Sequence, residues 1–481
     1  ELMSQLPHFP ELRFLRIDSL PLLGSLADLI NTPRRGLWTV SAGLEMYDRF
    51  SGDSGLPRHA VHNVDDIGMP AVDQKAFHWV VSYSDAQIRY PERLVAANLH
   101  DCEQIAAEKG LSFQLLTYHS VRRREANYQI FDRLRPDEPA VFELNPLIVV
   151  NATGAWGDYT LRELDISAER MFGGTRGSHF ITYNTRLREA IHGNGIYAEA
   201  PDGRPIFVLP FGMAVLVGTT DERFEDRPEN VRPLPHEMQY LLDAVNRLIP
   251  TAELTTEDIA VTYSGVRPLP YTPANAPSAV SRDHDLQLMI VDEVPVITLV
   301  GGKLTTWRAF SEQSTDKIFD VLSTERTCST EGRVIPGGED FPANNAAVQS
   351  QIDEWAALSG YTRDQIAAVW ELCGRLLERW LAAMTTPVSD PSETATSESL
   401  ADVDIPVSFA DWVITREWVR TLDDLLERRL LLVYHPNLSF QTIEQLADRM
   451  VHAGKLAEAE KPSAIERSLT RLREELGREV T

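Results

Sequence analysis

The stretch Val296-Ile297-Thr298-Leu299-Val300-Gly301-Gly302-Lys303 is a buried-strand run that ends in a glycine turn. A helix is predicted directly after it, from about Thr305 to Leu322, because apolar residues recur there at close to helical spacing. A strand, a tight turn and a helix start gather free backbone N–H groups and the positive end of the helix dipole. That point suits a phosphate or the electron-rich edge of a flavin. On the turn alone, a plain strand-to-helix connection with an exposed lysine is the better explanation.

Length and composition narrow the class of protein. The chain has 481 residues. A single hydrophobic core rarely serves more than about 250–300 residues, so two or three domains are expected. Apolar residues make up 43 % and charged residues 24 %, which excludes collagen-like, low-complexity and wholly disordered chains. The sequence contains no run of about 18 apolar residues, so no transmembrane helix is predicted. A net charge of −25 repels a phosphate backbone and argues against nucleic-acid binding.

The cysteine and histidine patterns predict neither a disulfide framework nor a metal site. The three cysteines lie far apart and form no CxxC pair, which is typical of a reducing compartment. No HExxH or paired-histidine spacing is present, and the chain contains no GxGxxG, GxSxG, Walker A or kinase signature.

Periodicity divides the chain into regions of different character. A helix at 91–109, ended by Gly110, precedes strand-like runs, which predicts an α/β layered region. A second group of strands reads as an antiparallel sheet, with Asp202-Gly203 as a hairpin turn. The first group of runs is 111–118, 129–134, 140–144 and 147–150, and the second is 178–183, 195–200, 205–210 and 214–218. A helix at 235–249 and a strand region at 259–270 follow, and helices are predicted at 363–384, 409–430, 441–454 and 462–478. The polar stretch 385–404 is predicted to be a flexible surface insertion.

Three further motifs carry chemistry only weakly when each is taken alone. The run 148–156 is a buried strand that ends in small residues, where a large ligand could approach the backbone closely. Arg267 and Arg282 lie in strand-like contexts, and a guanidinium binds phosphate or carboxylate through two hydrogen bonds. For either arginine alone, an ordinary ion pair with a carboxylate of this acidic chain is the better explanation. His179 is a weak candidate, since a lone histidine is usually structural.

The motifs are more specific as an ordered set. They are Val149-Val150-Asn151-Ala152-Thr153-Gly154-Ala155-Trp156, Arg176-Gly177-Ser178-His179, Gly218-Thr219-Thr220-Asp221, Ser264-Gly265-Val266-Arg267-Pro268-Leu269, Ser281-Arg282-Asp283 and Gly301-Gly302-Lys303-Leu304-Thr305-Thr306. In this order they resemble the FAD-dependent glycerol-3-phosphate dehydrogenases, and the similarity covers nearly the whole chain. Pro336-Gly337-Gly338 and the segment 417–426 resemble the helical C-terminal region of that family.

The resemblance implies a fold of mixed α/β and α+β character. It consists of a doubly wound FAD-binding domain, an antiparallel-sheet substrate domain and a helical C-terminal domain. The expected boundaries are 1–160 for the remainder of the FAD domain with part of the substrate domain, 161–290 for the sheet, 291–325 for the closing strand and helix, and 326–481 for the helices. The glycine-rich βαβ unit of the family would precede Glu1, so the FAD domain is expected to be incomplete at its N-terminus, and this chain alone is expected to bind FAD poorly.

The resemblance also implies the reaction and its residues. The family oxidises sn-glycerol 3-phosphate to dihydroxyacetone phosphate: a hydride passes from the substrate C2 to flavin N5, and a base takes the hydroxyl proton. Arg267 and Arg282 are implied as a phosphate clamp, with Lys303 at the junction of flavin and substrate. The implied FAD contacts are Gly302, Leu304 and Thr305 at the pyrimidine end, Ala152, Thr153 and Gly154 at the adenosine half, and Trp156. Arginine hardly deprotonates and is a poor base, so the base stays unnamed.

The implied partners are glycerol 3-phosphate, a membrane quinone that accepts the electrons, and the inner face of the plasma membrane, to which a cytoplasmic protein would attach peripherally. The family allows a homodimer. Three alternatives stay open: an oxidase that reduces oxygen, a cofactor-free remnant that only binds a partner, and a related flavin amine or hydroxy-acid oxidase. The motifs around Arg267 and Arg282 argue against the last, because they favour a phosphate over a carboxylate.

Overall fold

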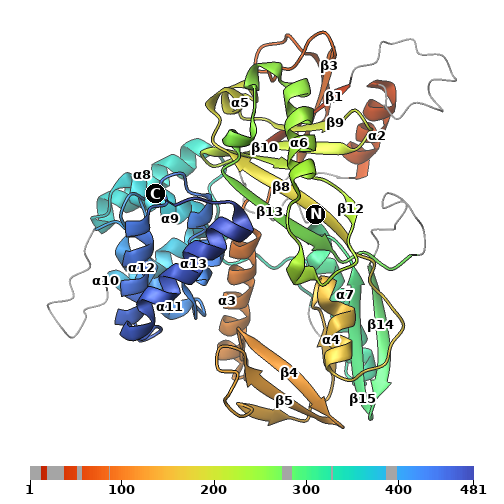
Figure 1. Ribbon diagram of the computed structural model, residues 1–481, viewed down its shortest axis with the longest axis vertical. Coiled ribbons are helices and arrows are strands. Elements are labelled where there is room, and N and C mark those ends of the chain that lie inside the picture. Colours follow the sequence, from red (N-terminus) through yellow and green to blue (C-terminus); the bar gives the residue numbers. More distant parts are fainter. Residues whose placement is uncertain are drawn as a thin grey trace.

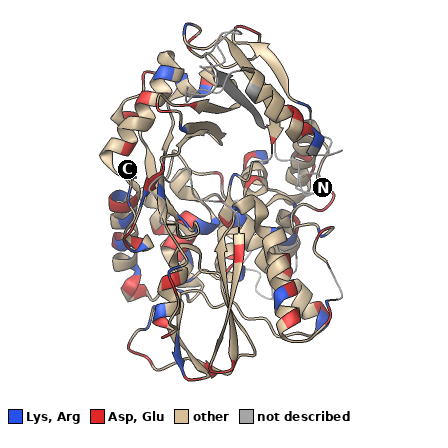
Figure 2. Ribbon diagram, turned by 90° about the vertical axis from the view of Figure 1, so that its right-hand side faces the viewer, with Lys and Arg blue, Asp and Glu red and all other residues tan. Residues whose placement is uncertain are grey.

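The fold is mixed α/β, with antiparallel sheets and a group of C-terminal helices (Figure 1). The computed structural model describes residues 12–18, 37–50, 57–85, 87–272, 284–326, 329–385 and 398–480. A large sheet occupies the upper part of the molecule in Figure 1, the C-terminal helices lie on its left, and two three-stranded sheets lie below it. Acidic and basic residues are interspersed along the ribbon rather than segregated by sign (Figure 2).

The large sheet has nine strands in the order β12-β8-β11-β10-β9-β1-β3-β2, with β13 also paired to β8. Their bounds are β1 Leu12–Asp18, β2 Ala60–Asn63, β3 Trp79–Asp85, β8 Thr175–Thr182, β9 Gly195–Glu199, β10 Pro205–Phe211, β11 Ala214–Gly218, β12 Glu222–Arg223 and β13 Val261–Arg267. The four predicted strands of the antiparallel sheet are therefore confirmed as β8 to β11. The predicted Asp202-Gly203 turn joins β9 to β10, and Gly203 has a φ of 80° there.

Strand β8 of the large sheet has a hydrophobic core on each side, and its alternate residues point into one core or the other. Phe180 packs in a core with α6 (Pro235–Leu248), whereas its neighbour Ile181 packs in a second core with the C-terminal helices. Both side chains are fully buried. Strand β8 therefore separates the two cores, and its odd-numbered residues lie on the side of the C-terminal helices.

A smaller sheet has the order β14-β15-β7 and contains the glycine turn. Its strands are β7 Val149–Asn151, β14 His284–Val291 and β15 Val294–Gly301. Strands β7 and β15 run parallel, while β14 and β15 form a hairpin whose turn residues Asp292 and Glu293 both have positive φ. The predicted helix after Lys303 is confirmed as a 3₁₀ turn, η6 Leu304–Thr306, that continues into α7 Trp307–Val321.

The third sheet and the remaining helices complete the fold. The third sheet has β4 His119–Arg124, β5 Asn127–Asp132 and β6 Phe142–Leu144. The other helices are α2 Leu37–Phe50, α3 Pro91–Lys109, α4 Gly157–Glu163, α5 Thr185–Ala190, α8 Asn345–Ser359, α9 Arg363–Cys373, α10 Leu377–Thr385, α11 Val407–Arg416, α12 Phe440–His452 and α13 Lys461–Leu476. The predicted helix at 91–109 matches α3, and Gly110 ends it in the left-handed conformation.

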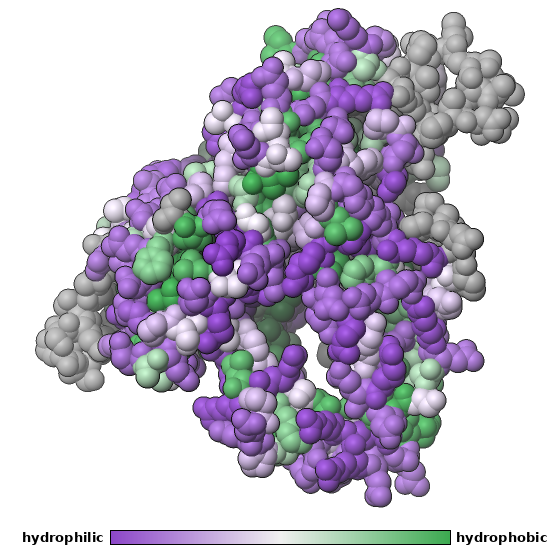
Figure 3. Space-filling view, viewed as in Figure 1, coloured by the Kyte–Doolittle hydropathy of each residue, from purple (hydrophilic) through white to green (hydrophobic). Residues whose placement is uncertain are grey.

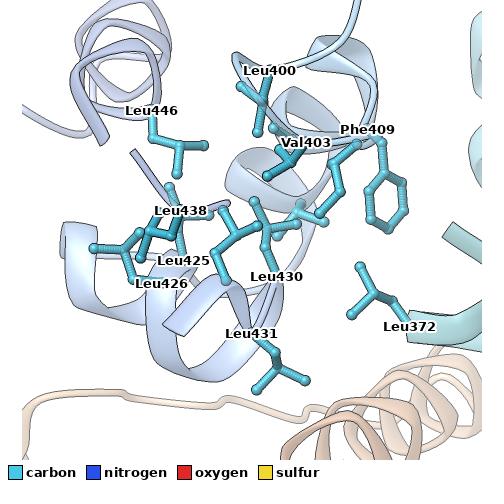
Figure 4. Close-up of a cluster of buried hydrophobic side chains, with 14 of the residues drawn as sticks. Leu372, Leu400, Val403, Phe409, Leu425, Leu426, Leu430, Leu431, Leu438 and Leu446 are labelled. Atoms are coloured by element: carbon cyan, nitrogen blue, oxygen red, sulfur yellow. The ribbon is translucent and has the colours of Figure 1, made fainter. Parts of the chain in front are cut away.

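The C-terminal helices share a core with one face of the large sheet, and in the helical part leucines meet from several helices and the loops between them (Figure 4). A buried ion pair joins this region to α3. Arg93 of α3 donates to both carboxylate oxygens of Glu417, at 2.5 and 2.9 Å, and to the carbonyl oxygen of Leu372 at 3.0 Å. Glu417 is fully buried, and Arg93 lowers its pKa to about 2 against the opposing effect of burial.

Two predicted helices are broken in the structure. The helix predicted at 363–384 divides at Gly374, whose φ is 54° and whose missing Cβ would lie 2.6 Å from the carbonyl oxygen of Gly337. Gly337 is equally confined, since its own Cβ would lie 2.7 Å from the carbonyl oxygen of Cys373. The helix predicted at 409–430 ends at Arg416, because Glu417 turns inward to Arg93; a π-helical turn, Asp424–Arg429, follows.

Two further predictions are corrected. Residues 111–116 form no strand, although one was predicted at 111–118, and strand β4 begins only at His119. An extended segment is a strand only when a neighbouring strand pairs with it, and none of the described residues pairs with 111–116. The stretch 385–404 is not a surface insertion throughout, because Leu400 and Val403 are buried in the C-terminal core. Residues 386–397 lie outside the described part of the chain.

Candidate functional site

The two loops predicted to contact a cofactor start at the same edge of the small sheet. Strand β7 pairs in parallel with β15, with Asn151 opposite Thr298, so the chain leaves both strands in the same direction. The 3₁₀ turn after β7, η1 Gly154–Trp156, lies against both β15 and β13. The structure therefore brings the 152–156 and 301–306 segments, which are 145 or more residues apart, close to one another and to the strand that carries Arg267.

The turn after β7 is held by Asn151, which is buried. Its amide Nδ2 donates to the carbonyl oxygen of Gly157 at 3.0 Å, and its Oδ1 accepts a hydrogen bond from the hydroxyl of Thr153 at 2.7 Å. Gly154 has a φ of 61°, and open space lies where its Cβ would be. Ala152 and Thr153 are exposed. The turn is thus fixed from inside and accessible from outside.

The turn after β15 has a similar character. Gly301 and Gly302 both have positive φ, of 77° and 90°, and the ring of Phe310 approaches to 3.3 Å of the position where Gly302 would carry a Cβ. The backbone N–H of Lys303 donates to the hydroxyl of Thr306, which closes the start of the helix. The side chains predicted to meet a ligand, those of Lys303, Leu304 and Thr305, are all exposed.

Trp156 is a predicted cofactor contact that is held by a carboxylate. Its indole N–H donates to Glu229 at 2.8 Å, and the side chain is 43 % exposed. Figure 3 shows the surface hollowed in the lower half of the molecule, between the β4–β5 and β14–β15 hairpins, rather than filled. A separate cavity of about 360 Å³ is lined by Ala155 of this loop together with Arg267.

Arg267 lies at the end of β13, opposite Thr175 of β8. Its guanidinium donates from Nη1 to Asp221 at 3.0 Å and from Nη2 to the hydroxyl of Thr219 at 3.0 Å. The group lies over Gly177, whose Cβ would come within 2.4 Å of it. The prediction that Arg267 forms an ion pair with a carboxylate is therefore confirmed. The absence of a side chain at Gly177 leaves the space that the guanidinium occupies.

His179 is the residue beside Arg267 that sequence reasoning undervalued. Its ring stacks on Tyr263 with 4.9 Å between centroids, and Gly218 leaves room for it, since a Cβ there would lie 2.1 Å from the ring. Burial, with a contribution from the charge of Arg267, lowers the pKa of His179 to about 4. Within the described part of the chain no group hydrogen-bonds its buried Nδ1. Gly177 and Gly218 were the signal in the sequence for this site, because a glycine in a strand often marks a place where another group approaches the backbone closely. Here these groups are the guanidinium of Arg267 and the ring of His179.

Arg282, the other half of the predicted clamp, lies in 273–283, outside the described residues. The structure therefore positions Arg267 and the two loops, and leaves the role of Arg282 a prediction. His284, which follows that segment, donates from Nε2 to the amide oxygen of Gln313 of α7 at 2.8 Å and packs on Phe310 at 4.4 Å between ring centroids. This contact fixes the start of β14 against the helix that follows the glycine turn.

Comparison with known proteins identifies the family. Residues 9–294 match the model of the FAD dependent oxidoreductase family. The chain is 30 % identical over 431 residues to a glycerol-3-phosphate dehydrogenase of Synechocystis, covering 84 % of this chain and 73 % of that protein. The chain belongs to the FAD-dependent glycerol-3-phosphate dehydrogenase family. The chain is also 28 % identical to D-erythritol 1-phosphate dehydrogenase of Brucella abortus, over 82 % of this chain and 75 % of that protein.

The fold agrees with this family. The glycerol-3-phosphate dehydrogenase of Bacillus halodurans, solved in complex with FAD, superposes with a TM-score of 0.68 at 20 % identity, over 98 % of this chain and 83 % of that one. Because the family is FAD-dependent, FAD is the cofactor, and the two loops fit it. Their glycines have positive φ or open space at the Cβ position, and the side chains around them are exposed at one sheet edge. As for membrane association, the described helices of this family member are too short or too polar to cross a bilayer.

Proposed function

We propose that the protein oxidises sn-glycerol 3-phosphate to dihydroxyacetone phosphate. The observation that supports this most directly is the guanidinium of Arg267, which lies over Gly177 and beside the neutral imidazole of His179, on a strand that contacts the cofactor loop. A guanidinium is suited to a phosphate, and a neutral imidazole is suited to a hydroxyl proton. Bound FAD supplies the hydride acceptor. The protein's own groups then have three tasks: to bind the phosphate, to take a proton and to hold the cofactor.

The phosphate is assigned to Arg267, with Arg282 as its proposed partner. Lys303 is proposed at the junction of cofactor and substrate. For the cofactor we propose contacts from Gly302, Leu304 and Thr305 at one end, from Ala152, Thr153 and Gly154 at the other, and from Trp156. The parallel β7–β15 pair is proposed to belong to a doubly wound FAD domain, which fits the boundaries 1–160 and 291–325, with 161–290 as the substrate domain and 326–481 as the helical domain.

His179 is proposed as the base. Because its pKa lies near 4, the ring is unprotonated at neutral pH and has a nitrogen able to accept a proton. A phosphate dianion bound to Arg267 would offset the arginine charge that helps to depress this pKa, and so would raise the basicity of the ring. Substrate binding would in this way prepare the group that removes the hydroxyl proton.

The proposed electron acceptor is a membrane quinone, reached by peripheral attachment to the inner face of the plasma membrane. Reduction of oxygen instead is the alternative. D-erythritol 1-phosphate is a competing substrate, because a relative named for it is 28 % identical and its phosphate could use the same arginine.

The test is anaerobic reduction of the FAD-loaded protein, followed by the visible flavin absorbance. Glycerol 3-phosphate is expected to bleach the flavin faster than D-erythritol 1-phosphate or glycerol, and a quinone is expected to restore the colour faster than oxygen. Arg267→Ala should raise the KM for glycerol 3-phosphate about 10- to 150-fold and hardly change that for glycerol, since a charge-assisted contact contributes about 1.5–3 kcal/mol. Arg223→Ala is the matched control, because Arg223 also pairs with Thr175 and is 32 % exposed, against 26 % for Arg267. Equal losses for both substrates would refute the phosphate assignment.

A further inference from the structure

The segment Gly218-Thr219-Thr220-Asp221 lies between Arg267 and the layer beneath the large sheet. It begins at the last residue of β11, and the side chains of residues 219–221 alternate between the two sides of the sheet. Thr219 and Asp221 reach Arg267, while Thr220 reaches the opposite side. This segment contains no group of the proposed chemistry, yet each of its residues has a specific contact.

On the side of Arg267, three hydrogen bonds hold the guanidinium, two of them to side chains. Nη1 donates to Asp221 at 3.0 Å, and Nη2 donates to the hydroxyl of Thr219 at 3.0 Å and to the carbonyl oxygen of Thr220 at 3.3 Å. Asp221 and Arg267 are about a quarter exposed, so water would compete for both groups if the geometry were loose. Bonds to both terminal nitrogens determine the plane of a guanidinium as well as its position.

On the opposite side, Thr220 is buried and anchors the segment. Its hydroxyl donates to Glu237 of α6 at 2.6 Å and accepts a hydrogen bond from the backbone N–H of Ser178 at 2.9 Å. Glu237 is itself 1 % exposed; it also accepts a hydrogen bond from the hydroxyl of Ser178 at 2.9 Å and pairs with Arg176 at 3.1 Å. Glu237 and the hydroxyls of Ser178 and Thr220 are hydrogen-bonded to one another in this buried layer, which limits the freedom of Thr220 to shift.

We infer that residues 219–221 are a positioning segment for Arg267: Thr219 and Asp221 orient the guanidinium, and Thr220 fixes both of them to Glu237. Gly218 contributes by leaving space for the ring of His179. The inference rests on the proposed function, because it assigns to the segment the orientation of the proposed phosphate-binding arginine. None of the three side chains is required to touch the substrate.

Paired variants test the inference on the FAD-loaded protein. Thr219→Val and Asp221→Ala each remove a bond to Arg267, and each is expected to raise the KM for glycerol 3-phosphate about tenfold or more, with little change for glycerol. Thr219→Ser and Asp221→Asn keep a hydroxyl or an oxygen that can accept the same bond, and both should recover most of the loss. Thr220→Val should also raise the KM for glycerol 3-phosphate, although it removes no group that contacts Arg267. Thr220→Ser keeps the hydroxyl and should have a KM close to that of the wild type.

Titration of inorganic phosphate into the oxidised protein, followed by the flavin spectrum, separates this inference from the proposed function. If wild-type protein binds phosphate but is not reduced by glycerol 3-phosphate, the proposed function fails while the inference still requires weaker phosphate binding in Thr219→Val and Asp221→Ala. The inference is overturned if these two variants bind phosphate as wild type does, or if the Ser and Asn variants lose as much as the Val and Ala variants. It is also overturned if the KM for glycerol rises by the same factor as that for glycerol 3-phosphate.

Discussion

Removing the carboxylate of Glu417 should destabilise the protein more than any other single charge substitution proposed here. Glu417 is fully buried, and Arg93 is 6 % exposed, so Glu417→Ala leaves a guanidinium in an apolar environment. Arg93 would keep its bonds to the carbonyl oxygens of Leu372 and Arg429 and lose two bonds to the carboxylate. Breaking a buried ion pair in this way costs about 3–5 kcal/mol, a large share of a total stability of about 5–15 kcal/mol.

The assay is urea unfolding followed by tryptophan fluorescence. Trp412 and Trp418 flank His100 of α3, at 6.1 and 5.1 Å between ring centroids, so their emission reports on the junction of α3 with the C-terminal helices. Arg93→Met combined with Glu417→Leu should cost less than the sum of the single changes, because an apolar pair replaces both charges. Asp353→Ala is the control: Asp353 pairs with Arg363 at 2.8 Å on the surface, and an exposed pair contributes about 0–1 kcal/mol.

The pH dependence gives a second measurement. The pKa of Glu417 is about 2 in the folded protein and about 4.3 in an unfolded chain. Its contribution to stability is therefore complete above pH 4.3 and is lost as the pH falls towards 2. The difference between wild type and Glu417→Gln should shrink over this window. A destabilisation below about 1 kcal/mol in Glu417→Ala at pH 7, or a difference from Glu417→Gln that does not change with pH, would refute the argument.

Three further outcomes are expected. Gly302→Val should lower the ratio of bound FAD to protein, because the residue has a φ of 90° and Phe310 approaches it closely, whereas Gly265→Ala, with open space at its Cβ, should bind FAD as wild type does. The pKa of His179 is about 4 in the folded protein and about 6.5 when unfolded, so the unfolded chain binds more protons between these values and stability rises with pH across them; His179→Gln should flatten this rise in urea midpoints measured from pH 4 to 6.5. High salt or alkaline carbonate should release the protein from membranes, and a requirement for detergent would contradict peripheral attachment.

The sequence predicts those strands and helices that are defined locally by the spacing of apolar residues and by the turn residues at their ends. The β15 strand, its glycine turn and α7 follow from a buried run, two glycines and helical spacing within a single segment. Strand β14 was missed because its turn to β15 uses Asp292 and Glu293, which give no glycine signal for a hairpin. The local pattern of residues 111–118 predicts a strand, but pairing depends on other parts of the chain, which no local pattern reports.

The candidate site was predictable in its parts and not in its contacts. Gly302 and Arg267 could be selected from their motifs, but the partners of Arg267 at Asp221 and Thr219 lie 46 and 48 residues away in the sequence. The same limit applies to Glu417, which meets Arg93 across 324 residues. The periodicity of apolar residues describes only local structure and does not show which residues far apart in the sequence come together. The orientation of each charged group therefore became visible only in the folded structure.

The contact between Gly337 and Gly374 bears on how this region can evolve. The backbone of each glycine occupies the space in which the other residue would place a Cβ. A substitution at one position therefore does not make room for a larger residue at the other. Both positions are therefore expected to remain glycine together in homologous chains, including those whose surrounding helices have diverged in sequence. Pro336-Gly337-Gly338 and a solitary glycine 37 residues downstream then form a marker for this junction that can be found by reading a sequence alone.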